Sequence, residues 1–262
     1  MQDYWHKQAP GKPLFPELEW SRPENKAHAG KLLIVGGHAQ SFAAPAEAYG
    51  EAMKARVGTA RVVLPDALHK TVGQLFPAAE FCTSNPSGGF AQQCLGELLA
   101  IGQWADGVLL AGDFGRNSET AILLEKFLDK YSGQATLTKD AVDYFTATPL
   151  PLLRRENVTL VLSFAQLQKL AMGAKFTKAF TFDLGLLQLV ELLHDFTEQF
   201  SVNIVTKHLE NIFVAAHGQI SSTKLEQDIA IWRTKTAAHA AVWWLQNPGK
   251  SFEALSTAVV EK

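Results

Sequence analysis

Short apolar runs alternate with helix-like segments along most of the chain. Each run is bounded by glycine, proline or polar residues, and the segments between the runs carry apolar residues at the spacing of an amphipathic helix. Runs of this kind are typical of strands that are buried on both faces. The alternation therefore predicts an α/β fold with a mostly parallel sheet. The five runs assigned to this sheet are residues 32–35, 61–64, 107–111, 135–137 and 158–162.

Two further strands are expected after a long apolar helix at residues 184–200. Residues 202–206 and 212–216 are apolar and are separated by a short polar segment, which favours an antiparallel edge on the sheet. Other helices are expected at residues 44–56, 118–130 and 252–260.

The segment 223–246 has two interpretations. Thr223 and Glu226 form the pattern of a capping box, which would start a helix at once. In the other interpretation, alternating isoleucines form a strand first, and the helix begins only near Thr236.

Residues 1–30 are interpreted as an N-terminal arm, and residues 31–262 as a single domain. Four prolines exclude a long helix from the arm, and its aromatic residues argue against a disordered segment. We expect the arm to pack across the domain or against another subunit. A lid over a ligand is the alternative.

Composition narrows the class of protein. The chain is 47% hydrophobic and 19% charged with a net charge of −2, so nothing favours a nucleic acid or an anionic membrane as partner. No stretch approaches the ~20 apolar residues that a membrane helix needs. The two cysteines are too few for a disulfide framework or a structural zinc site, which predicts a cytoplasmic protein without a metal centre.

The chain has more apolar surface than one small core needs, which predicts a homo-oligomer. This surface comes from the arm, the helix at 184–200, and Trp243 with Trp244. Adjacent residues of a helix point about 100° apart. We therefore expect one tryptophan in the core and the other at an interface.

The candidate ligand site is centred on residues 105–120. A glycine-rich loop, Gly112 to Arg116, follows an apolar strand, and Asn117 and Ser118 can cap the next helix. This arrangement places free backbone N–H groups and the positive end of a helix dipole at the edge of the sheet. It predicts a pocket for a phosphate-bearing ligand. Arg116 could bind a phosphate through its forked guanidinium or form a salt bridge with Glu119.

Other strand ends are expected at the same edge of the sheet. Gly36 and Gly37 follow the first strand, and Asp140 follows the strand at 135–137. Because the carboxyl ends of parallel strands meet at one edge, these residues should converge with Gly112. The alternative for Asp140 is a helix N-cap.

Two stretches resemble a known family. Residues 28–37, followed by Ala43-Ala44-Pro45, are similar to the opening strand and Gly-Ala-Pro turn of the nucleotide-dependent NAD(P)H-hydrate dehydratases. Residues 106–116 are similar to their Gly-Pro-Gly-Leu-Gly-Arg loop. The resemblance covers residues 20–260. It implies a three-layer ribokinase-like α/β domain that uses ATP or ADP with Mg²⁺ to remove water from hydrated NAD(P)H.

The same resemblance shows departures at the positions expected to carry chemistry. The family's Asp-Ala-Asp-Ala-Leu motif corresponds to residues 138–142, which keep Asp140. Its Thr-Pro-His-x-x-Glu loop corresponds to residues 163–166, which contain no histidine or glutamate, and its Lys-Gly pair corresponds to Lys207-His208. Its Gly-Ser/Thr-Gly-Asp motif corresponds to residues 234–237, with Ala237 in place of the catalytic aspartate.

The resemblance implies a set of site residues. Asp140 is the retained acidic candidate, and Asp228 could replace the missing base if its segment folds into the pocket. The helix near Ala237 should point its N-terminus into the pocket. The implied substrate- and nucleotide-binding residues are Gly36, Gly37, Pro45, Gly112, Gly115, Arg116, Lys207, Thr234, Lys235 and Thr236.

Three functions follow from this set. The first is an NAD(P)H-hydrate dehydratase-like protein with a degenerate site, either still working with rearranged catalytic groups or, as we expect, with weak or absent nucleotide binding and no detectable turnover. The second is a non-catalytic nucleotide-binding or structural ribokinase-like protein. A small-molecule kinase ranks third, because that class needs the same missing base.

Overall fold

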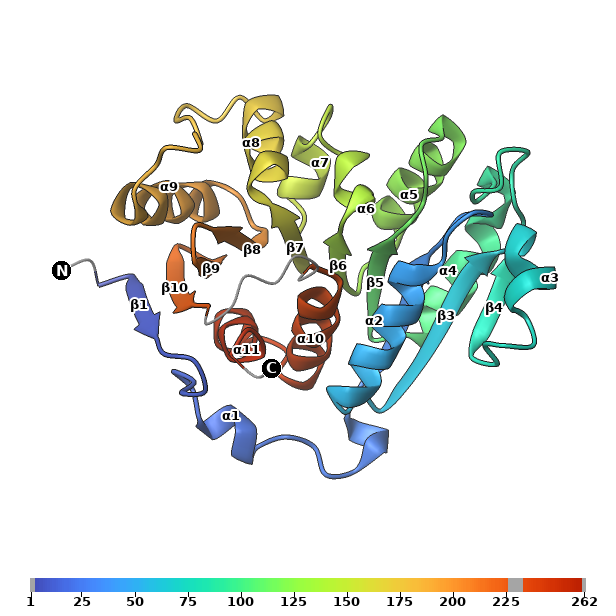
Figure 1. The fold of residues 1–262 in the computed structure, drawn as a ribbon, viewed down its shortest axis with the longest axis horizontal. Coiled ribbons are helices and arrows are strands. Elements are labelled where there is room, and N and C mark those ends of the chain that lie inside the picture. Colours follow the sequence, from blue (N-terminus) through green and yellow to red (C-terminus); the bar gives the residue numbers. More distant parts are fainter. Residues whose placement is uncertain (1–2, 226–232, 261–262) are drawn as a thin grey trace.

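A mixed sheet forms the centre of the molecule (Figure 1). The computed structural model describes residues 3–225 and 233–260. In these residues the strand order is β1-β10-β9-β8-β7-β6-β5-β2-β3-β4, and all neighbours are parallel except β8–β9 and β9–β10. The strands are β1 Trp5–Gln8, β2 Lys31–Gly36, β3 Thr59–Pro65, β4 Ala79–Cys82, β5 Gly107–Gly112, β6 Gln134–Thr138, β7 Val158–Ser163, β8 Asn203–His208, β9 Asn211–Ala216 and β10 Gln219–Lys224.

Helices cover both faces of the sheet (Figure 1). Side chains alternate along β2, so that Leu33 packs in the core under one helix layer and Ile34 in the core under the other. One layer contains α2 Ala43–Lys54, α10 Arg233–Gln246 and α11 Ser251–Ala258. The other layer contains α4 Leu95–Trp104, α5 Ser118–Lys130, α6 Asp140–Asp143, α7 Leu150–Leu153, α8 Phe164–Gly173 and α9 Leu186–Gln199. Two short helices, α1 Glu17–Trp20 and α3 His69–Val72, lie in the connecting segments.

The predicted three-layer fold is confirmed. The five apolar runs form β2, β3, β5, β6 and β7 of one sheet, and the expected antiparallel edge is β8–β9–β10. The long apolar helix is α9, whose buried residues include Leu189, Leu193 and Phe196. Apolar periodicity was sufficient here because every strand of the parallel core is buried on both faces.

The capping-box interpretation of residues 223–226 is wrong. Thr223 lies in β10, where it pairs with Gln8 of β1 and Ile212 of β9. Its hydroxyl accepts a hydrogen bond from Gln8 Nε2 at 2.7 Å. Strand pairing on both sides therefore overrides a local helix signal. The alternative strand at Ile229 and Ile231 lies outside the described residues, and α10 is described from Arg233.

The N-terminal arm packs across the molecule, as expected. Its first strand, β1, adds a parallel edge to β10, and Trp5 Nε1 donates to Ser222 Oγ at 3.0 Å. Further along, Leu18 packs with Trp243 and Trp244 in a small core of its own.

The expectation that one tryptophan of α10 lies at a subunit interface is wrong. Trp243 and Trp244 are 0% and 3% exposed within this chain. Both are covered because α10 lies between the sheet on one side and α1 with α11 on the other.

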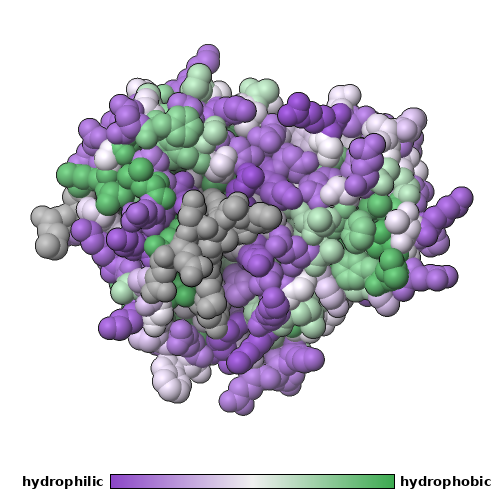
Figure 2. All heavy atoms as spheres, viewed as in Figure 1, coloured by the Kyte–Doolittle hydropathy of each residue, from purple (hydrophilic) through white to green (hydrophobic). Residues whose placement is uncertain are grey.

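The surface carries apolar patches as well as charge. Figure 2 shows a mostly polar face with apolar areas at its left, over α8 and α9, and at its right. Exposed apolar side chains of the α8–α9 segment include Met172, Phe182 and Leu187. A homo-oligomer stays a prediction, and light scattering tests it. In the described part of the chain, no helix is both long and apolar enough to cross a membrane.

Candidate functional site

Two glycines bring the ends of β2 and β5 into close contact. Gly36 and Gly112 are register partners, and the Gly37 N–H donates to the Gly112 carbonyl at 3.1 Å. A Cβ on Gly36 would stand 2.5 Å from the Gly112 carbonyl oxygen. Gly112 has a φ of +104°, a conformation that favours glycine. The predicted convergence of the two glycine turns is therefore present. Pro45 packs beneath them, with its Cδ 3.4 Å from the position of that Cβ.

Asp140 joins the same edge from β6. Its Oδ2 accepts a hydrogen bond from the Gly115 N–H at 3.1 Å, and its buried Oδ1 has no hydrogen-bond partner in the structure. Burial raises the pKa of Asp140, and the nearby Asp113 charge adds to the increase. The alternative interpretation of Asp140 as an N-cap is wrong. Lys139 holds the cap position of α6, and the Asp140 side chain turns to the glycine loop instead.

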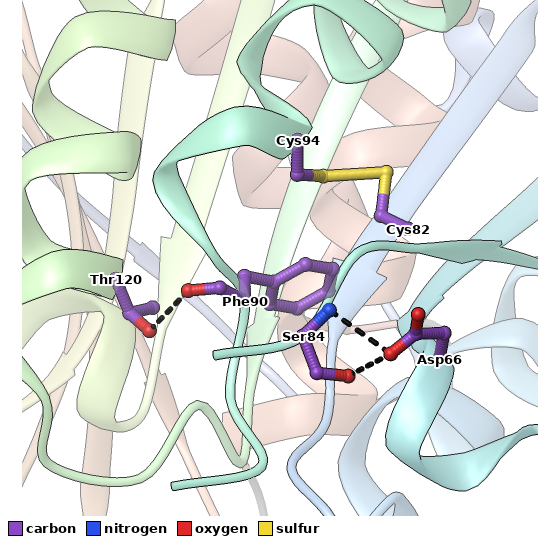
Figure 3. Close-up of a disulfide and its surroundings, with 6 residues drawn as sticks. All are labelled: Asp66, Cys82, Ser84, Phe90, Cys94 and Thr120. Carbon is purple, nitrogen blue, oxygen red and sulfur yellow. Dashed lines mark hydrogen bonds between the residues drawn. A yellow bond between two sulfur atoms is a disulfide. The ribbon is translucent and has the colours of Figure 1, made fainter. Parts of the chain in front are cut away.

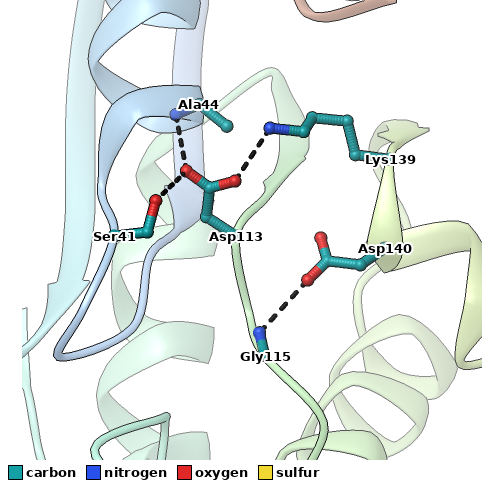
Figure 4. Close-up of polar contacts among 6 residues, drawn as sticks. All are labelled: Ser41, Ala44, Asp113, Gly115, Lys139 and Asp140. Atoms are coloured by element: carbon teal, nitrogen blue, oxygen red, sulfur yellow. Dashed lines mark hydrogen bonds and ion pairs between the residues drawn. The ribbon is translucent and has the colours of Figure 1, made fainter.

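Asp113 and Lys139 form an ion pair that the sequence analysis missed (Figure 4). Lys139 Nζ lies 2.8 Å from Asp113 Oδ1. Asp113 Oδ2 accepts hydrogen bonds at 2.8 Å from the Ser41 hydroxyl and from the Ala44 N–H in the first turn of α2. Burial alone would raise the pKa of Asp113, but these donors outweigh it and lower that pKa. The signal in the sequence was an aspartate where the resembled loop has glycine.

Arg116 borders a cavity of about 450 Å³. The side chain is exposed, and Glu119, its expected salt-bridge partner, accepts a hydrogen bond from the Gln92 N–H at 2.9 Å. No Arg116–Glu119 bridge occurs among the described contacts, so the forked phosphate contact stays a prediction. The expected cap of α5 is confirmed, since Asn117 Oδ1 accepts from the Glu119 N–H at 2.8 Å. Asp140, Tyr144 and Lys169 also line this cavity.

The start of α10 lies at this edge of the sheet. Arg233 donates to Gln166 Oε1 at 2.9 Å, and Gln166 Nε2 donates to the Lys139 carbonyl at 2.7 Å. Thr234 and Thr236 are 1% and 2% exposed, and within residues 3–225 and 233–260 each hydroxyl lacks a hydrogen-bond partner.

The other implied residues of this region have mixed positions. Lys235 is exposed, and Ala237 is fully buried. Lys207 pairs in register with Ser163 near the carboxyl end of β8. Lys207 lies two residues after Val205, so the two side chains point to the same face of the sheet. Val205 packs in the core that α10 covers, and Lys207 therefore faces the α10 side. Asp228 lies outside the described residues.

A disulfide that was not expected from the sequence supports the loops of the site (Figure 3). Cys82 and Cys94 are paired, with their Cα atoms 5.6 Å apart. In the loop that they close, the Gly88 carbonyl accepts from the Ala39 N–H at 2.8 Å and Ser87 Oγ accepts from Asn117 Nδ2 at 3.0 Å. This single disulfide braces both the loop after β2 and the cap of α5.

A larger cavity, of about 560 Å³, lies between α5 and α7. It is lined by residues such as Leu128, Leu152 and Arg155. Arg155 donates to the Leu128 and Gly133 carbonyls, so its charge is used at the C-terminal end of α5. None of the glycine-loop residues lines this cavity, and we do not assign it to the site.

The arrangement of strands and helices is similar to that of solved ribokinase-like structures. A ribokinase-like superfamily protein from Enterococcus faecalis V583 superposes with a TM-score of 0.76 at 15% identity, covering 99% of this chain and 87% of that chain. An ADP/ATP-dependent NAD(P)H-hydrate dehydratase from Bacillus subtilis, co-crystallised with ATP and Mg²⁺, superposes with a TM-score of 0.62 at 12% identity, covering 95% and 86%.

Sequence comparison adds a local match. A stretch of 98 residues is 31% identical to the bifunctional NAD(P)H-hydrate repair enzyme Nnr of Methanothermobacter thermautotrophicus. The match covers 37% of this chain and 18% of that enzyme, so the chain spans about a fifth of its relative. No protein-family model matches the chain.

Proposed function

We propose that this protein is an NAD(P)H-hydrate dehydratase-like protein that binds a nucleotide-bearing small molecule and does not turn it over efficiently. ATP or ADP and hydrated NAD(P)H are the proposed ligands. The similarity to the Bacillus subtilis and Methanothermobacter proteins supports this class. The observation that carries the proposal is the composition of the first turn of α10.

That turn is suited to a phosphate group. Thr234 and Thr236 present two buried hydroxyls that have no hydrogen-bond partner among the described residues, at the positive end of a helix dipole. Lys207 faces the same side of the sheet. Hydroxyls, a cation and free backbone N–H groups are the donors that hold phosphate at helix N-termini.

The same turn lacks a base. Among the residues that the structure describes, the first turn of α10 contains no acidic side chain, and Ala237 is 0% exposed. A threonine hydroxyl cannot take a proton from a substrate at neutral pH. Because a general base typically contributes about 10²–10⁴ in rate, we expect turnover to fall by at least this factor.

Magnesium would enter with the nucleotide. Among the described side chains no group of three or more acidic, histidine or cysteine residues is placed to hold a metal ion. Asp113 already pairs with Lys139 and accepts from Ser41 and Ala44, so its charge is compensated within the chain. The residues at α10 fit phosphate oxygens, and Mg²⁺ is commonly held through such oxygens, where it neutralises charge.

Calorimetry and a repair assay test the proposal together. The parent protein should bind ATP or ADP weakly and show no dehydration of NADH hydrate above the uncatalysed rate. A restored variant carries Thr234→Gly, Lys235→Thr, Thr236→Gly and Ala237→Asp. Glycine would let a phosphate approach the backbone N–H groups that the threonine side chains crowd, so this variant should bind nucleotide more tightly despite losing the two hydroxyls. It should also gain turnover by at least about 100-fold.

A matched control isolates the carboxylate. The variant with the first three substitutions and Ala237 retained should bind nucleotide but stay inactive. Robust turnover by the parent would overturn the proposal, and Asp228 would then be the first residue to replace. Failure of parent and restored variant alike to bind any nucleotide would overturn it as well.

The proposal extends to assembly and location. We expect a homo-oligomer in the cytoplasm whose partners are small molecules rather than nucleic acid or membrane. Disulfides are rare in the cytosol, so the redox state of Cys82 and Cys94 in intact cells tests this location directly.

A further inference from the structure

Two non-glycine residues in left-handed backbone conformations face each other at the edge of the sheet. Asp113 has a φ of +61° and Lys139 a φ of +52°. Such conformations are unfavourable for residues other than glycine and persist where the surrounding contacts fix them. Here the contact is the 2.8 Å ion pair between the two side chains. Both residues also depart from the resembled motifs, Asp113 replacing a glycine and Lys139 an alanine.

The pair closes one corner of the site (Figure 4). The Asp113 side chain is 12% exposed, and its carboxylate meets three donors, from Lys139, Ser41 and the Ala44 N–H. The Ala44 N–H is one of the free donors at the start of α2, a helix of 12 residues. The carboxylate therefore occupies the place where an external anion would meet the same donors.

We propose that Asp113 is a built-in anion that determines ligand specificity, because it excludes phosphate and carboxylate groups of a ligand from the corner between β2, β5 and β6. Lys139 holds it there. A ligand must then place its phosphate elsewhere, and it presents neutral, hydrogen-bond-donating groups such as sugar hydroxyls or amides to this corner. The adjacent Asp140, a second acidic side chain, favours the same kind of group.

This specificity role goes beyond the proposed function and does not depend on dehydratase chemistry. It concerns the start of α2, whereas the proposed nucleotide phosphate lies at the start of α10. Removal of the carboxylate should leave Lys139, Ser41 and the Ala44 N–H free for an external anion.

Inorganic phosphate is the probe, with binding measured by calorimetry. Asp113→Gly removes the carboxylate and keeps the left-handed backbone available, and Asp113→Ala removes the carboxylate while keeping a Cβ. Both variants should bind phosphate at least tenfold more tightly than the parent. Asp129→Asn, at an exposed position of α5, changes the net charge equally and should leave phosphate affinity unchanged.

Second substitutions locate the gained binding. In the Asp113→Gly background, Lys139→Met should abolish the gain, while Thr236→Val should not, because Thr236 belongs to α10. Unchanged phosphate affinity in Asp113→Gly, with cooperative unfolding retained, would overturn the proposal. A gain that Thr236→Val removes and Lys139→Met leaves intact would overturn it too. If Asp113→Gly does not fold, Asp113→Ala decides alone.

Discussion

The Asp140 carboxylate accepts a hydrogen bond from the Gly115 N–H over 3.1 Å and so ties the loop after β5 to the first residue of α6. Its second oxygen is buried beside Gly112 and has no hydrogen-bond partner among the described residues. Asp140 therefore fixes the position of the glycine loop.

Replacing Asp140 should loosen this loop. Asp140→Ala leaves the Gly115 N–H without its partner and should lower the free energy of unfolding by about 1–3 kcal/mol. Asp140→Asn keeps an acceptor and should cost less. Urea unfolding of the two variants measures both effects.

The pH dependence of the same comparison has a defined sign. The pKa of Asp140 is raised in the folded protein, so the folded protein favours the protonated carboxyl. The contribution of Asp140 to the free energy of unfolding is therefore largest below the ordinary aspartate pKa of about 4 and is lost as the pH rises through the pKa of the folded state. The stability of the parent relative to Asp140→Asn should therefore fall as the pH rises from about 4. A difference that grows with pH would contradict the assigned environment.

Gly36 is expected to tolerate no side chain. In Gly36→Ala the new Cβ would lie 2.5 Å from the Gly112 carbonyl oxygen, so the ends of β2 and β5 must separate. We expect a loss of about 1–3 kcal/mol in the free energy of unfolding.

Gly50→Ala is the matched control for this change. A Cβ on Gly50 meets nothing within 4 Å, and alanine is favoured over glycine inside a helix such as α2 by roughly 0.5–1 kcal/mol. Thermal unfolding should show opposite shifts for the two variants. Equal shifts would show that the contact between β2 and β5 is not the cause.

The fold and the place of the site follow from the sequence because they depend on local patterns. Apolar runs identified the parallel strands, and residues that directly follow such strands, Gly36, Gly112 and Asp140, had to meet at one edge. Phosphate-binding roles for the implied residues remain predictions, since position does not establish them.

The remaining features depend on contacts between segments that no local pattern encodes. The pair Asp113–Lys139 requires two left-handed residues in loops of different strands. Thr223 carries a helix-start signal, yet pairing with β1 and β9 decides its conformation. In each case a long-range partner outweighs a local preference.

Two tyrosines should ionise at unusually high pH. Burial raises the pKa of Tyr144 to about 12, and the pKa of Tyr131 is likewise raised to about 12, mainly by burial. The Tyr144 hydroxyl donates to the Gly115 carbonyl at 2.7 Å. These values exceed the ordinary tyrosine pKa of about 10. The stabilisation of the folded protein by the two protonated tyrosines is therefore complete below about pH 10 and is lost towards about pH 12.

Tyrosinate absorbance during an alkaline titration measures the ionisation of the tyrosines. The parent should show a component near pH 12 that decreases in Tyr144→Phe. Tyr49→Phe removes a tyrosine outside the site and is the control, since it should leave that component in place. A single transition near pH 10 for all tyrosines would contradict the burial of both rings.

The disulfide should contribute measurably to stability. Cys82 and Cys94 are separated by 12 positions, and closing a loop of this length is worth about 3 kcal/mol in the chain-entropy model. A double variant, Cys82→Ser with Cys94→Ser, should lose about this amount in urea unfolding.

Reductant provides the control for the disulfide. Dithiothreitol should lower the stability of the parent to that of the double variant and leave the variant itself unchanged. Both cysteines are buried, at 1% and 0% exposure, so reduction of the folded protein requires local opening and should be slow without denaturant.

The Gly88 carbonyl, in the loop that the disulfide closes, accepts from the Ala39 N–H beside the β2 glycine turn. Reduction should therefore also speed amide exchange at Ala39. Parent stability that does not respond to dithiothreitol after denaturation and refolding would show that the two thiols are not paired in the protein.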